Sequence, residues 1–157
     1  MTDPDGMTAE ARLRSFVQKY EAKGQKLFRA LRTAMRKRFP TANELAYEYA
    51  DSVVISYAPG ERGMEGIVTL ALREDGVRLY LAQGPKLPDP KKLLMGSAKQ
   101  VRYIPVEAAS RLDHPEVEAL IAAAIKKALV PMPKSGGGKL VIQSDAKKRE
   151  SRRKSAT

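Results

Sequence analysis

The sequence predicts an α+β fold in which two N-terminal helices and one C-terminal helix pack on one face of an antiparallel sheet of about four to five strands. Apolar residues recur at helical spacing in the first quarter of the chain and again after residue 113. Between these segments the pattern changes to the two-residue period of strands, interrupted by turns rich in proline and glycine. Helices that flank a continuous run of strands are typical of the α+β class.

The first predicted helix follows a short N-terminal segment, residues 1–7, that we expect to be disordered. Thr8 is placed to cap the helix, and Gly24 is placed to end it. Four apolar residues share one face of this helix: Leu13, Phe16, Val17 and Tyr20.

A second helix is predicted from about Gln25 to Arg38, ending before Pro40 because the residue that precedes a proline avoids the helical region. Its predicted buried residues are Leu27, Leu31, Ala34 and Met35. Its other face is basic and carries Lys26, Arg29, Arg32, Arg36 and Lys37. A charged face opposite an apolar stripe is typical of any surface helix, although this one could also contact phosphates.

The strands of the predicted sheet follow the second helix. An Asp-Gly pair at residues 75–76 predicts a hairpin turn, and the strict alternation after it predicts a half-buried strand. The expected strands cover residues 45–49, 52–57, 67–72, 77–82 and 101–105.

The last predicted helix has the strongest start signal, because Asp113 and Glu116 can form a capping box around a proline in the first turn. Its apolar stripe, which ends before Pro131, consists of Val117, Leu120, Ile121, Ala124, Ile125 and Leu129. We therefore expect one domain over residues 8–132, followed by a glycine-containing linker and a basic tail over 133–157. Within that segment, residues 139–144 either add an edge strand or pair only with a partner.

The net charge of the 157 residues is +11. Residues 133–157 hold eight Lys or Arg and two acids, a net charge of +6, so about half of the excess lies there. A basic tail of this kind can attract nucleic acid, anionic lipid or an acidic partner, and it also favours solubility. The tail residues expected to make such contacts are Lys147, Lys148, Arg149, Arg152, Arg153 and Lys154.

Several functional classes lack the residues they need. There is no cysteine, and the one histidine, His114, lies within a helix-start signal, so we expect no catalytic group, no metal site and no cofactor. There is neither a signal peptide nor an apolar run long enough to span a membrane, so we expect a cytoplasmic protein. Because no set of catalytic residues is recognisable, we also expect it to be non-enzymatic. The oligomeric state stays open.

The segment GPKLPDPKKLLMGSAKQVRY, residues 84–103, combines prolines and glycines with five cations: Lys86, Lys91, Lys92, Lys99 and Arg102. Under one interpretation these cations bind an anionic ligand or an acidic partner. Asp89 could then cap a short helix over residues 90–95, whose first amides would favour an anion. Under the other interpretation the prolines stiffen a connection between strands, Leu93 and Leu94 fill the core, and the lysines are only solvated.

The same segment resembles the YdhG-like family of small bacterial proteins of unknown function. The matching residues are Gly84, Leu87, Pro88, Asp89, Pro90, Leu93, Leu94, Gly96, Lys99 and Arg102. Residues 47–59, 112–128 and 139–154 are also similar, so the resemblance covers roughly residues 25–154. Ala98 departs from the family pattern, which has a second glycine at this position. If that glycine adopts a positive φ, alanine is strained here or the turn has a different shape.

The resemblance implies a frataxin-like fold, and for some relatives an iron-chaperone role. Iron would need exposed carboxylates, whereas the acids of this basic chain are dispersed. We therefore expect a binding protein for an anionic ligand, nucleic acid or an acidic protein, with a frataxin-like iron-binding chaperone as the alternative.

Overall fold

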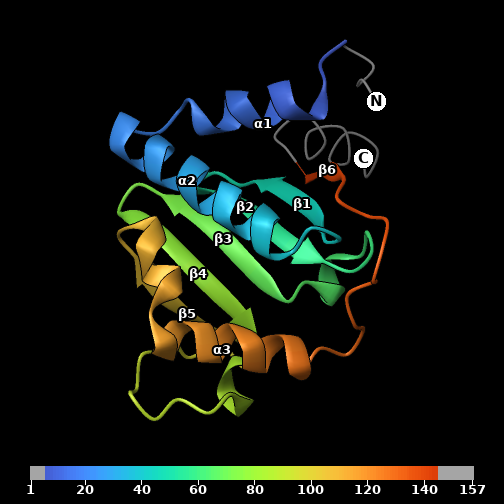
Figure 1. Ribbon diagram of the computed structural model, residues 1–157. Helices are drawn as coiled ribbons and strands as arrows, with labels where there is room; N and C mark the ends of the chain where they lie inside the picture. Colours follow the sequence, from blue (N-terminus) through green and yellow to red (C-terminus); the bar gives the residue numbers. More distant parts are fainter. Residues whose placement is uncertain (1–5, 145–157) are drawn as a thin grey trace, which may run out of the picture.

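The computed structural model describes residues 6–144 and shows an α+β fold with three helices and one six-stranded sheet (Figure 1). The elements follow in the order α1 (Ala9–Val17), α2 (Ala22–Arg38), β1 (Asn43–Glu48), β2 (Ser52–Ala58), η1 (Gly63–Glu65), β3 (Val68–Arg73), β4 (Gly76–Ala82), η2 (Gly84–Lys86), β5 (Val101–Val106), η3 (Ala109–Asp113), α3 (Pro115–Lys126) and β6 (Leu140–Ser144), where η denotes a 3-10 helix. Two N-terminal helices and one C-terminal helix agree with the predicted fold class.

The sheet differs from the prediction in strand number and in direction. Its order is β5-β4-β3-β2-β1-β6, with an antiparallel meander from β1 to β5 and β6 parallel to β1. The antiparallel part of the sheet thus has five strands, within the predicted four to five. Residues 140–144 add a sixth strand on the edge of this same sheet, which the sequence had left open. The amide of Glu44 donates to the carbonyl of Lys139 at 2.7 Å, where this added strand begins to pair.

The first helix begins where the sequence predicts but ends earlier than predicted. Thr8 caps α1, since its hydroxyl oxygen accepts from the amide of Ala11 at 3.1 Å. Gly24 does not end α1 but lies in the first turn of α2, where a Cβ atom would come within 3.2 Å of the Leu72 side chain. The small size of this glycine therefore lets α2 pack closely against β3, and the residue does not end a helix.

The predicted capping box at α3 is wrong. Asp113 belongs to η3, and the cap position is taken by His114, whose side chain makes no capping hydrogen bond. The helix also ends earlier than predicted, at Lys126, and Leu129 is 84 % exposed. Asp113, the residue that the pattern assigned to the cap, is the last residue of the 3-10 turn, and His114 links this turn directly to α3.

The core lies between the sheet and the helices, which cover one face of it (Figure 1). Phe28, Leu31 and Met35 of α2 are at most 1 % exposed and pack on the sheet together with Val117 and Ile121 of α3. In the part of the chain that the structure describes, no helix is both long and apolar enough to cross a membrane.

Candidate functional site

The basic loop, residues 83–100, connects β4 to β5 and is held closely at its first turn. Gln83 adopts a left-handed conformation with φ of 57°, and the chain then turns through η2. A Cβ atom at Gly84 would lie 2.5 Å from the backbone nitrogen of Arg102, so only glycine fits against β5 here. Leu87 is 7 % exposed and fixes the loop to the core.

Asp89 organises the middle of the loop in a way that differs from the prediction. The two oxygens of its carboxylate accept from the amides of Leu93 and Leu94, each at 2.9 Å. No helix forms over residues 90–95, and Lys92 is left-handed with φ of 53°. The amides of Leu93 and Leu94 are therefore already bound to a carboxylate of the loop itself, and the predicted helix start with its free first amides does not form.

The last part of the loop pairs with the sheet edge. Met95 and Tyr103 exchange two backbone hydrogen bonds, at 2.8 and 3.0 Å, and Gly96 follows with φ of 103°. Ala98 is not among the residues with positive φ, so its departure from the family pattern carries no backbone strain. The loop is therefore attached at its beginning, middle and end.

The five predicted cations of this loop do not form one common site. Four of them are exposed, and their side chains make no hydrogen bond or ion pair within residues 6–144: Lys86, Lys91, Lys92 and Lys99. Arg102 is different, because its guanidinium donates to the backbone carbonyls of Ala98 and Val101. The lysines are thus available to a partner, whereas Arg102 holds the end of the loop.

The predicted tail contacts, from Lys147 to Lys154, lie outside the described residues. Leu93 and Leu94, which the alternative interpretation assigned to the core, are half-buried against it. The half-buried leucines and the exposed lysines both agree with the second interpretation, and anion binding by the lysines stays a prediction.

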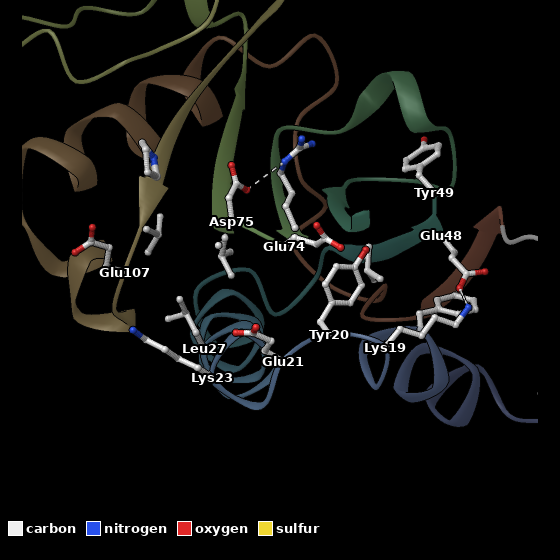
Figure 2. A pocket seen from close by; sticks show the side chains of 18 of the residues that line it. Lys19, Tyr20, Glu21, Lys23, Leu27, Glu48, Tyr49, Glu74, Asp75 and Glu107 are labelled. Carbon is white, nitrogen blue, oxygen red and sulfur yellow. Dashed lines mark hydrogen bonds and ion pairs between the residues drawn. The ribbon is translucent and has the colours of Figure 1, made fainter. Parts of the chain in front are cut away.

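A cleft of about 1180 Å³ lies at the other end of the sheet, between the corner that joins α1 to α2 and the turns after β1 and β3 (Figure 2). The register places it opposite the basic loop, because Val77 pairs with Val106 at the cleft end and Ala82 pairs with Val101 at the loop end. Its charged lining residues are the acids Glu21, Glu48, Glu74, Asp75 and Glu107 and the cations Lys19, Lys23 and Arg73.

Part of the charge in this cleft is neutralised internally. Lys19 binds Glu48 at 2.6 Å, and Arg73 lies 3.5 Å from Asp75 (Figure 2). Burial raises the pKa of Tyr20, and the nearby carboxylates of Asp51 and Glu48 raise it further. The cleft is therefore negative relative to the rest of this basic protein.

The sequence did not indicate this cleft. Its lining comes from four separate turns, and each acid has a local reason to occupy a turn, so no spacing along the chain connects them. In the described residues, no three His, Asp or Glu side chains come close enough to share a metal ion.

Comparison with known protein families, with characterised proteins and with solved structures gives no match to this chain. The resemblance to the YdhG-like family, and the frataxin-like fold that it implies, stay predictions.

Proposed function

We propose that this protein is a non-enzymatic binding protein that engages an anionic ligand or an acidic partner through the basic loop, with the tail adding contacts of low specificity. The observation that carries the proposal is the state of the four loop lysines, whose side chains are exposed and unpaired within the described residues. Their loop is held to the fold by the buried Leu87, the half-buried Leu93 and Leu94, and the backbone pairing of Met95 with Tyr103. A pre-ordered basic surface loses less conformational entropy on binding than a free one.

The geometry favours an extended acidic segment over a small anion. No loop lysine lines the cleft of Figure 2 or the shallower cleft between the end of β5 and the start of α3. The amides of Leu93 and Leu94 are also bound to Asp89, so a small anion would meet mainly separate, solvated ammonium groups. An acidic segment can contact several such groups at once, and the weak contacts then add up.

The test is binding of a fluorescein-labelled glutamate dodecamer, followed by anisotropy in low salt. Exchange of Lys86, Lys91, Lys92 and Lys99 for glutamine removes four exposed ion pairs worth about 0.2–1 kcal/mol each, so the affinity is expected to fall by a factor between about 4 and several hundred. The matched control removes the same charge from exposed cations elsewhere, namely Arg62, Lys126, Lys127 and Lys134. Equal losses in both variants, or no loss in the loop variant, would contradict the proposal.

A further inference from the structure

Helix α2 has an unusual charge composition. Its 17 residues, AKGQKLFRALRTAMRKR, contain seven cations and no acid. Solvated helices normally mix both signs, because Glu and Lys four residues apart stabilise each other. A helix with one sign alone forgoes that stabilisation.

Some of these cations turn toward neighbouring elements and bind the nearest carboxylates. Arg32 donates four hydrogen bonds of 2.7–2.9 Å to Glu44 and Glu10. Arg38 forms a bidentate pair with Glu118 of α3 at 2.5 Å. The carboxylates of Glu10, Glu44 and Glu118 are therefore already engaged.

The outer face of α2 is left without a counter-charge. The exposed side chains of Lys23, Lys26, Arg29 and Lys37 make no ion pair within residues 6–144. Arg36 is only loosely held, with its Nε atom 3.7 Å from Glu44. At 1.5 Å per residue, this basic face is about 21 Å long.

The shape of the same face suits close approach by a regular polyanion. Ala30 and Thr33 are exposed at its centre, so small side chains lie between the cations at the two ends. The hydroxyl of Thr33 donates back to the carbonyl of Arg29 at 3.0 Å and adds little height. No large apolar or aromatic side chain is exposed on α2, since its leucines, phenylalanine and methionine are buried or half-buried.

We propose that the outer face of α2 binds the phosphate backbone of nucleic acid without reading its sequence. A membrane surface would require an exposed apolar face on the helix. The core of a protein interface would be depleted in lysine and enriched in aromatic residues. Cations around small residues, with no aromatic group to stack on a base, fit a row of phosphates. This proposal does not depend on the basic loop, which lies on another part of the molecule.

The experiment measures binding of the full chain to a 20-base-pair DNA duplex between 50 and 200 mM NaCl. The variant combines Lys26→Gln, Arg29→Gln and Lys37→Gln, and glutamine keeps a helix propensity close to that of lysine. Each lost phosphate contact makes the slope of log K against log salt less steep by about 1, so the triple variant should change it by about 3. Affinity at 50 mM NaCl is expected to fall roughly tenfold or more.

Two comparisons make the result decisive. The control Lys126→Gln, Lys127→Gln and Lys134→Gln removes the same charge from another surface and is expected to leave the slope within about 1 of the unsubstituted protein. An equal change in the control, or an unchanged slope in the α2 variant, would overturn the proposal. If the α2 variant lost affinity for anionic vesicles or the glutamate dodecamer but not for DNA, the partner assigned here would be wrong. Loss of dodecamer binding in the loop variant tests the proposed function separately.

Discussion

Glu44 lies in the interior, 2 % exposed, and its carboxylate needs partners because a buried charge without them is costly. The Tyr57 hydroxyl donates to its Oε2 atom at 2.8 Å, and Arg32 binds both of its oxygens. Although burial disfavours the charged guanidinium, hydrogen bonds to Glu44 and Glu10 raise the pKa of Arg32. The sequence did not predict this cluster, since its members come from α1, α2, β1 and β2 at no regular spacing.

Replacing Tyr57 by phenylalanine removes a hydrogen bond to a charged group, which contributes about 1.5–3 kcal/mol, and leaves the ring in place. Burial raises the pKa of Tyr57, and the charge of Glu44 raises it further. The folded protein therefore keeps this phenol neutral above pH 10, where the phenol of the unfolded chain ionises. The stability that it contributes is complete below pH 10 and is lost above it, at about 1.4 kcal/mol per pH unit.

We thus expect Tyr57→Phe to lower the free energy of unfolding at pH 7 and the difference from the unsubstituted protein to shrink by about 1.4 kcal/mol at pH 11. Urea unfolding at pH 7, 9 and 11 measures both effects. Tyr49→Phe is the matched control, because Tyr49 is 44 % exposed and its hydroxyl makes no hydrogen bond in the described structure. A difference for Tyr57→Phe that stays constant from pH 7 to 11 would argue against the raised pKa.

At the scale of elements, β6 depends on contacts that a local pattern does not contain. The side chain of Asn43 accepts from the amide of Lys139 at 3.1 Å and donates to the carbonyl of Gly60 at 3.1 Å. The strands of the meander were predictable because alternation and hairpin turns are local signals. A parallel edge strand joined by a long connection needs pairing that only the folded molecule provides.

The three glycines before β6, predicted as a linker, all have positive φ, and one of them is in tight contact. A Cβ atom at Gly137 would lie 1.9 Å from the carbonyl oxygen of Thr41, whereas one at Gly136 would meet nothing within 4 Å. Alanine at either position has the strain of a left-handed residue, about 1 kcal/mol, but only Gly137→Ala also displaces the chain from β1.

Gly137→Ala is therefore expected to speed hydrogen exchange at the amides of β6, and Gly136→Ala to leave those amides closer to their original protection. Exchange followed by mass spectrometry or NMR compares the two variants directly. Similar exchange in both would mean that strain alone, and not the contact with Thr41, determines how β6 is held.

At the scale of the whole molecule, the sequence predicted the excess of positive charge but not its arrangement. The basic loop was recognisable from its own residues, and the exposure of its lysines agrees with the interpretation in which they are solvated. The basic face of α2 was also recognisable, but its exact composition was not. In the sequence Arg32 and Arg38 look like ordinary surface cations. Only the fold shows that they turn inward and leave the outer face unneutralised, while the acids gather around the cleft at one end of the sheet.

Because β6 completes the sheet, the place of a truncation decides what it measures. A chain ending at residue 132 would lose β6, expose the edge of β1 and remove Ile142, which is 7 % exposed in the core. Loss of one buried isoleucine alone removes about 1.5–3 kcal/mol. A chain ending at residue 144 keeps the whole sheet and lacks only the tail.

We expect the chain ending at 132 to unfold roughly 5–10 °C below the chain ending at 144, and to self-associate at higher concentration through the free edge of β1. Thermal unfolding followed by circular dichroism and sedimentation velocity measure these two effects. Equal melting temperatures would mean that β6 adds no stability to the sheet. If the temperatures differ as expected, any loss of polyanion binding in the shorter chain combines damage to the fold with removal of charge, so the contribution of the tail has to be measured in the chain that ends at residue 144.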